Sequence, residues 1–143
     1  MMASAVLEKS EAEPSRRTFA IVWDSYGSST VVGVGVLQPD AAEARVWPSG
    51  EPHVVLRGFS VDARYQGKGI GTAATAEAVA LAGRLFTTAL AVVLTVHVDN
   101  IAGQRAYESN GFEYTGRCVL GRAGQERVMA RWLNGVAKAA VPV

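Results

Sequence analysis

Short runs of β-branched and aromatic residues alternate with turn-forming residues along the first half of the chain. Two such runs, residues 18–24 and 30–37, flank a Tyr-Gly-Ser-Ser segment at 26–29, which predicts an antiparallel hairpin. Residues 53–61 repeat the pattern and predict a third strand. The intervening residues 39–52 contain Pro, Asp, Ser and Gly, so we expect a loop there, with a short extended piece around residues 44–47.

The apolar spacing changes to a helical period between residues 72 and 86. This alanine-rich segment lacks proline and predicts a helix that starts at Gly71 and Thr72. Residues 91–98 form a near-continuous β-branched run, which predicts a central strand covered on both faces. Asp-Asn at 99–100 supplies N-cap chemistry for a second helix over residues 101–109, and Asn-Gly at 110–111 ends it.

The last two apolar runs, residues 112–120 and 126–133, predict a final hairpin around residues 121–124. The expected order is therefore β-β-β-α-β-α-β-β, an α/β (α+β) fold with a central twisted mixed sheet. The polar residues 1–17 indicate a flexible N-terminal arm. We expect a single domain at 18–134 and a C-terminal tail at 135–143.

Composition narrows the class of protein. The 143 residues are 49% hydrophobic and 19% charged, and 14 basic against 13 acidic residues give a net charge of +1. These values exclude a disordered chain and give no sign of nucleic acid or an anionic membrane as a partner. One cysteine, Cys118, and two histidines cannot form a structural zinc site from the usual ligands, so we expect no metal. No segment is long enough to span a membrane, and a cytoplasmic location is expected.

The most informative stretch is the glycine-rich turn at residues 64–72, RYQGKGIGT, between a strand and a helix. Small residues let backbone N–H groups approach an anion, and a helix N-terminus adds about half a positive charge. The turn therefore predicts a diphosphate cradle, although the glycines could also serve only a tight turn. A P-loop is absent because no hydroxyl follows Lys68, and a dinucleotide fingerprint would need a glycine at Thr72.

Two motifs resemble one family. Residues 64–71 resemble the [RQ]-x-x-G-x-[GA] signature of the GNAT superfamily of acyl-CoA-dependent N-acyltransferases. Residues 100–112, NIAGQRAYESNGF, are similar to that family's N-x-x-A-x-x-x-Y-x-x-x-G-F segment, with Gly103 at the usual alanine position. The resemblance implies that two parallel central strands splay apart and that acetyl-CoA binds across the opening as co-substrate. It also implies an amine acceptor. The sequence departs from the family at its start, where the polar residues 1–17 leave the expected N-terminal helices reduced or missing.

The resemblance further implies which residues contact the coenzyme. The amides of residues 67–72 would hold the pyrophosphate, while Asn100 and the backbone of residues 59–61 would contact the pantetheine arm. Arg64 and Lys68 would add charge near the phosphates or remain solvated. The expected cofactor-binding residues are Phe59, Ser60, Val61, Arg64, Gln66, Gly67, Lys68, Gly69, Ile70, Gly71, Thr72, Asn100 and Tyr107.

Tyr107 resembles the family tyrosine that protonates the departing thiolate. Family members often carry a glutamate as base at one of two positions, which here hold His53 and Thr95. Strand alternation places His53, Val55, Arg57, Phe59 and Val61 on one face, and Thr95, His97 and Asp99 on one face of the next strand. His53 and His97 are therefore candidate catalytic bases, and each could instead be a satisfied structural histidine. Glu51, Asp62 and Glu113 are further candidates.

The sequence thus predicts an N-acetyltransferase that moves the acetyl group of acetyl-CoA to a primary amine in a ternary complex. The missing carboxylates keep open a catalytically weak acyl-CoA-binding regulatory module, and a dinucleotide-binding domain is a third reading. Family members normally place a strand and two helices before the first hairpin, and those helices wall the acceptor site. We therefore expect one of three explanations: the substrate cleft is unusually open, a partner chain closes it, or the given sequence starts downstream of the true start of the protein. Exposed sheet edges favour a homodimer.

Overall fold

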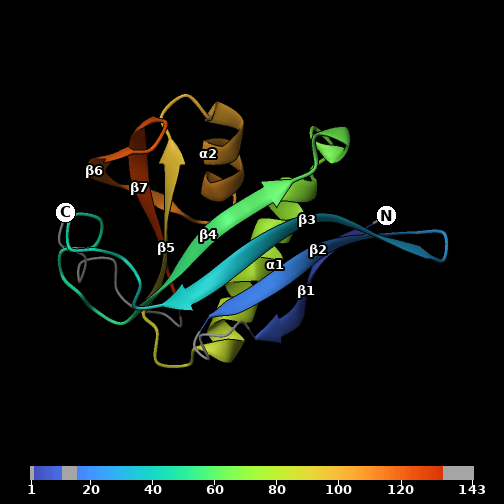
Figure 1. Ribbon diagram of the computed structural model, residues 1–143, viewed down its shortest axis with the longest axis horizontal. Coiled ribbons are helices and arrows are strands. Elements are labelled where there is room, and N and C mark those ends of the chain that lie inside the picture. The colour runs from blue at the N-terminus through green and yellow to red at the C-terminus, as the bar shows by residue number, and fades with distance from the viewer. Residues whose placement is uncertain (1, 11–15, 134–143) are drawn as a thin grey trace.

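In the part of the chain that the computed structural model describes, residues 2–10 and 16–133, seven strands form one mixed sheet (Figure 1). Their order across the sheet is β1-β2-β3-β4-β5-β7-β6, and only the neighbours β4 and β5 run parallel. The strands are β1 (Met2–Ser10), β2 (Arg17–Ser25), β3 (Ser28–Pro39), β4 (His53–Val61), β5 (Ala91–His97), β6 (Glu113–Gly121) and β7 (Gly124–Trp132).

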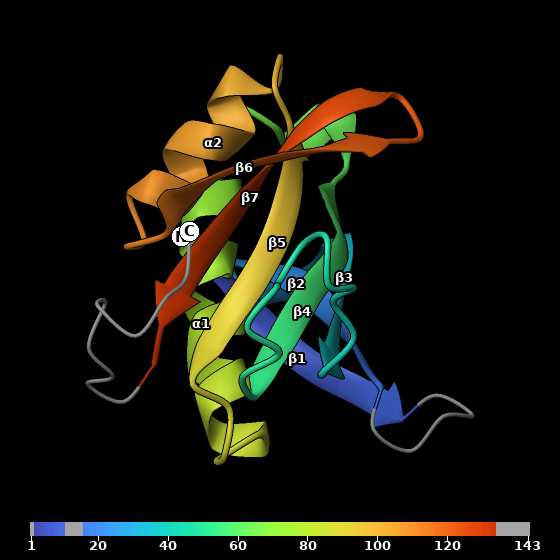
Figure 2. The same ribbon diagram turned by 90° about the vertical axis from the view of Figure 1, so that its left-hand side faces the viewer.

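Two helices cover one face of this sheet: α1 (Ile70–Leu85) and α2 (Ile101–Glu108) (Figures 1 and 2). A short 3-10 helix, η1 (Ala63–Tyr65), joins β4 to the loop before α1. Ala74, Ala78 and Ala82 are buried at every fourth position of α1, so small side chains let the helix approach the sheet closely. The larger core cluster lies on this side, where these alanines meet side chains such as Phe19 and Leu94.

The opposite face is covered by the segment at residues 40–52, which crosses β4 and β5 on the side away from α1 (Figure 2). Trp47 anchors it, because the indole is 3% exposed and its Nε1–H donates to the Glu51 carbonyl at 3.2 Å. The extended piece expected at residues 44–47 is wrong: the amides of Val46 and Trp47 both donate to the Glu43 carbonyl, at 2.9 Å each, and form a turn. Burial of the indole against Val93 and Val128 favours that turn over a strand.

The predicted element order from residue 18 onward is confirmed. The N-terminal arm expected at residues 1–17 differs, because Met2–Ser10 form β1 and pair antiparallel with β2 from Met2↔Asp24 to Ser10↔Arg17. Without β1, the long strand β2 would be a bare edge. Residues 1 and 11–15 of the arm and the tail expected at 135–143 lie outside the described residues. No described residue before β4 is helical, so the N-terminal helices that are usual in the family are not seen in the described residues, as expected from the polar residues that begin this chain.

The two parallel strands stay together for only three residue pairs: His53↔Ala91, Val54↔Val92 and Val55↔Val93. Beyond that point β4 continues alongside β3, while β5 pairs with β7 along its whole length, as far as His97↔Glu126. The predicted splay of the central parallel strands is therefore confirmed, and it opens toward the C-terminal ends of both strands.

A bulge in β4 reverses the two faces of that strand. The register with β3 shifts between Val34↔Ser60 and Val36↔Arg57, and Gly58 in the bulge has a φ of +58°. Before it Val54 and Leu56 face α1, and after it Phe59 and Val61 do. The prediction that His53, Val55, Arg57, Phe59 and Val61 share one face is therefore wrong. The first three lie on the face away from α1, and the last two lie on the face toward it.

Gly35 leaves room for the ring of Phe19 in the core. This packing predicts that an added side chain at position 35 lowers the stability of the fold. A Cβ at position 35 would meet the Phe19 ring, which is fully buried and packs against Phe59 with centroids 6.4 Å apart. We expect Gly35→Ala to lower the free energy of unfolding by about 1–3 kcal/mol through overpacking, measured by urea denaturation. Gly83→Ala is the matched control, because a Cβ there meets nothing within 4 Å and should add about 0.5–1 kcal/mol of helix stability. Equal stability of the two variants would contradict this packing.

Candidate functional site

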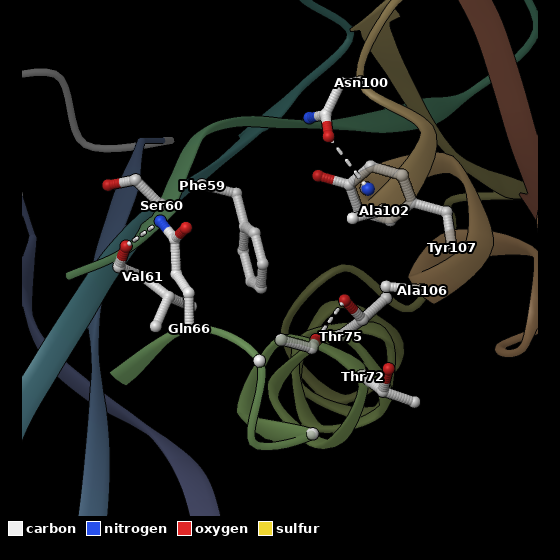
Figure 3. Close-up of a pocket in the computed structure, with 14 residues that line it drawn as sticks. Phe59, Ser60, Val61, Gln66, Thr72, Thr75, Asn100, Ala102, Ala106 and Tyr107 are labelled. Carbon is white, nitrogen blue, oxygen red and sulfur yellow. Dashed lines mark hydrogen bonds between the residues drawn. The ribbon is translucent and has the colours of Figure 1, made fainter. Parts of the chain in front are cut away.

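A cavity of about 470 Å³ opens where β4 and β5 part, on the face that carries the two helices (Figure 3). The C-terminal end of β4 forms one wall, the glycine loop and the first turns of α1 form the floor, and α2 forms the other wall. The lining residues are Phe59, Ser60, Val61, Gln66, Gly67, Gly69, Gly71, Thr72, Thr75, Asn100, Ala102, Gly103, Ala106 and Tyr107. The splay thus produces a pocket between elements that are distant in sequence.

The glycine loop presents the N-terminus of α1 to this pocket. Gly67 and Gly69 adopt φ values of +75° and +80°, which suit glycine and form a concave backbone around Lys68. Gly69 is the N-cap, no side chain caps the helix, and the first helical hydrogen bond runs from the Ala73 amide to the Gly69 carbonyl at 3.1 Å. The amides of residues 70–72 therefore lie at the positive end of the helix dipole, where an anion binds favourably.

The facing helix α2 is fixed at both ends. The Asn100 Oδ1 accepts the Gly103 amide at 2.9 Å and caps the helix, and a Cβ at position 103 would lie 2.5 Å from the Asn100 Nδ2. Glycine at the family's alanine position therefore lets this carboxamide fold onto the helix end. At the other end the Asn110 Nδ2–H₂ donates to the carbonyls of Thr72 and Ala106, at 2.9 Å each, and so joins α1 to α2.

Tyr107 lies in the pocket wall opposite Phe59 (Figure 3). Its ring contacts Phe59 and Phe112, with centroids 6.3 Å and 5.7 Å away. Burial raises the pKa of the Tyr107 phenol above its ordinary value of 10.0, because the charged form loses hydration. The phenol therefore holds its proton at neutral pH and can donate it.

Most of the expected cofactor-binding residues meet at this pocket, but three do not line it. Ile70 is 5% exposed and belongs to the core. Arg64 donates to both carboxylate oxygens of Asp62, at 3.1 and 3.0 Å, and this hydrogen bonding holds the pKa of Asp62 below its usual value. Lys68 is exposed between the two loop glycines. The backbone of the glycine loop therefore lines the pocket, whereas the side chains of Arg64 and Lys68 do not.

His53 lies at the opposite end of β4 from the pocket and is 3% exposed. The Ala42 amide donates to its Nε2 at 3.1 Å, so Nε2 carries no proton and the Nδ1–H donates to the Glu51 carbonyl at 2.8 Å. Both ring nitrogens therefore hold the 40–52 segment in place, which is a structural role.

His97 is likewise engaged by the main chain. The Asp99 amide donates to its Nδ1 and its Nε2–H donates to the Ala123 carbonyl, each at 3.1 Å, so the ring fixes the turn between β6 and β7. Neither histidine lines the pocket, and neither do Glu51, Asp62 or Glu113. None of the described lining residues is an aspartate or a glutamate.

Four lining residues were absent from the sequence-based set: Thr75, Ala102, Gly103 and Ala106. Helical spacing would have found two of them, since Thr75 lies one turn after Gly71 and Gly103 one turn before Tyr107. The Thr75 hydroxyl donates to the Gly71 carbonyl at 2.7 Å.

A second cavity, of about 330 Å³, lies on the other face of the same splay, beneath the 40–52 segment. It includes Leu56 and Leu94, whose side chains belong to the core on the α1 side, so it reaches in between the separating strands. The full lining is Ala41, Ala42, Glu43, Val46, Val55, Leu56, Arg57, Gly58, Val93, Leu94 and Thr95. The splay therefore has one cavity on each face of the sheet.

The fold and these cavities define an α+β protein in which a helix N-terminus without a side-chain cap lies beside a splayed parallel strand pair. The family model described as "Acetyltransferase (GNAT) family" matches residues 3–112. The chain therefore belongs to the GNAT acetyltransferase family, and this membership supports acyl-CoA-dependent N-acetyl transfer in general.

Solved structures share the fold. The chain is 19% identical to spermidine N-acetyltransferase from Vibrio cholerae in complex with CoA and spermine. The match covers 85% of this chain and 68% of that one, and its TM-score is 0.65. Arabidopsis thaliana NAA60 with a bisubstrate analogue is 18% identical over 85% and 78% of the two chains, with a TM-score of 0.65. The aminoglycoside acetyltransferase AAC(6')-Ib with ribostamycin and coenzyme A is 21% identical over 85% and 66%, with a TM-score of 0.64.

No curated protein matches the chain. Among the described residues no helix is long and apolar enough to cross a membrane, and no group of three or more His, Cys, Asp or Glu residues could hold a metal ion.

The bonding of His53 predicts that its loss affects stability and leaves catalysis intact. We expect His53→Ala to lower the free energy of unfolding by about 2–4 kcal/mol, because it removes buried volume and orphans the Ala42 amide. The acetyl-transfer rate per folded molecule should stay within about threefold of the wild type. Urea denaturation and a rate assay on the same preparations measure both. His97→Ala is the control, with a smaller loss of stability because its ring is partly exposed. A stable His53→Ala protein with a large loss of rate would contradict the structural role.

Proposed function

We propose that the protein is an N-acetyltransferase that moves the acetyl group of acetyl-CoA directly to a primary amine in a ternary complex. One observation carries the proposal: a single pocket at the strand splay joins an anion cradle to a protonated tyrosine. The family membership supports the reaction class, and relatives crystallised with CoA support the coenzyme.

The two parts of the coenzyme fit different walls of the pocket. The pyrophosphate lies over the amides of residues 70–72 at the uncapped N-terminus of α1, and Lys68 adds positive charge beside it. The pantetheine arm runs along residues 59–61 of β4, because none of the described strands pairs with β4 on the β5 side after Val55. Its amides can then pair with that strand edge as a further strand would.

The chemistry requires a neutral amine, a polarised carbonyl and a proton for the thiolate. The amine lone pair attacks the thioester carbonyl carbon and the C–S bond breaks. The thiolate takes the proton of Tyr107, and the amine releases a proton to solvent, from which the phenolate is reprotonated. The acceptor approaches through the second cavity, on the face opposite the coenzyme.

The site has no dedicated base among the described lining residues, which favours acceptors that deprotonate easily. A lysine-like amine with a pKa of about 10.4 is neutral in roughly one molecule per thousand at about pH 7.4. Its deprotonation therefore costs about 4 kcal/mol of free energy. A terminal α-amine with a pKa of about 8 demands only about 1 kcal/mol. The same observation favours a second candidate function, an acyl-CoA-binding regulatory module with little turnover. A cytoplasmic location and a homodimer stay predictions.

The direct test is isothermal titration of acetyl-CoA together with thiol release across a panel of amines and peptides. We expect saturable binding and amine-dependent release of CoA. Binding without release on every amine would favour the regulatory module, and no binding at millimolar acetyl-CoA would reject both functions.

Tyr107→Phe tests the proton donor. The variant keeps the ring contacts with Phe59 and Phe112, so the Kd for acetyl-CoA should stay within about threefold, while kcat should fall about 10- to 100-fold. Because burial raises the pKa of Tyr107, its proton is lost only above its ordinary value of 10.0, and the wild-type kcat should show no descending limb below about pH 10. An unchanged kcat in the variant would remove the assigned role.

A further inference from the structure

The second cavity carries an unbalanced positive charge. Of the residues that line it, only Glu43 and Arg57 carry full charges. The Glu43 carboxylate already has a cation, because its Oε2 accepts the Arg45 Nε–H at 3.1 Å. Arg45 is held in turn by a hydrogen bond from Nη1 to the Leu120 carbonyl at 3.3 Å. Glu43 and Arg45 therefore neutralise one another at the outer wall.

Arg57 has no such counter-charge. Its Nη1–H donates to the Gln38 Oε1 at 3.0 Å, and the carboxamide is neutral. Among the described residues from 16 to 133, no carboxylate forms an ion pair with this guanidinium. The remaining donors of the guanidinium fork are suited to a planar anion such as a carboxylate.

Arg57 lies close to the point where β4 and β5 separate. Arg57 immediately precedes Gly58, whose positive φ marks the bulge, and it lies two residues beyond the last β4–β5 pair at Val55. It is on the face away from α1, and Thr95 from β5 lines the same cavity. A molecule that enters between the strands from this side therefore passes the guanidinium.

We propose that the second cavity selects a small primary amine that also carries a carboxylate, with the carboxylate bound by Arg57 and the amine directed through the splay. The identification of the amine rests on the proposed function, and the binding of the carboxylate rests on the cavity itself. A volume of about 330 Å³ is at the small end of ligand pockets and suits an amino acid or a dipeptide. The unpaired guanidinium repels a polycation such as the spermine bound by the Vibrio cholerae relative.

The test compares two acceptors that differ only in the distal carboxylate, alanyl-alanine and alanyl-alaninamide. Their α-amines are alike, so the ratio of their kcat/KM values isolates recognition of the carboxylate. We expect the wild type to prefer alanyl-alanine by about 10- to 100-fold, the range for a hydrogen-bonded charged group, and to act poorly on spermidine. Arg57→Gln should abolish the preference by lowering kcat/KM for alanyl-alanine alone, and Arg57→Lys should restore part of it.

Arg84→Gln is the matched control, because Arg84 is an exposed arginine in the last turn of α1 and lines neither cavity at the splay. It should leave the ratio unchanged, and the Kd for CoA should be the same in all variants. A wild type that favours alanyl-alaninamide or spermidine, or an Arg57→Gln protein that keeps the preference, would overturn the proposal.

Titration of alanyl-alanine into the CoA-loaded protein separates this proposal from the proposed function. Arg57-dependent binding without acetyl transfer to any amine would support the carboxylate site and reject the N-acetyltransferase. Acetyl transfer with no dependence of rate or binding on Arg57 would support the enzyme and reject the carboxylate site.

Discussion

The separation of β4 from β5 after Val55 and Val93 is the constraint on which the remaining structure depends. Each strand needs hydrogen-bond partners for its backbone, and each finds them on its outer side, β4 with β3 and β5 with β7. The inner edges are left open at the centre of the sheet, where a continuous ladder would otherwise close it. One cavity on each face accompanies this single break. In the proposed reaction, this arrangement lets the two substrates meet without sharing an entrance.

A row of aromatic side chains connects the sheet to the pocket wall that carries Tyr107. Phe19 packs against Phe59, Phe59 against Tyr107, and Tyr107 against Phe112. Gly35 makes the first contact possible, because any side chain there would occupy the space of the Phe19 ring. The position of the phenol is therefore set by core packing, and the same burial that fixes its position also raises the pKa of the phenol above its ordinary value. Stability and chemistry thus depend on the same contacts at this wall.

Local signals in the sequence predicted the parts of the site that local geometry determines. The glycine loop, the N-cap at Asn100 and the position of Tyr107 each depend on spacing within one helix or turn, and the structure brings them to one pocket. Two features that depend on pairing between strands, β1 and the bulge in β4, were not predicted. The strand at Met2–Ser10 is defined by its pairing with β2. The isolated Gly58 was the available signal for the bulge, and overlooking it placed Phe59 on the wrong face.

The histidines show why residue type alone was insufficient to assign a base. Each lies where its two ring nitrogens meet a backbone donor and a backbone acceptor, so both nitrogens are engaged by the main chain. A group held in this way would break a structural hydrogen bond each time it accepted a proton. Under the proposed function, an acceptor amine with a low pKa avoids this cost, because a larger fraction of it is already neutral. Under the proposed function, the electrostatic features of the two faces divide between the substrates: the α1 dipole would face the phosphates of the coenzyme, and Arg57 would face the acceptor. Both features would stabilise anions at a distance from the thioester, and the partly buried Tyr107 would supply the proton to the departing sulfur.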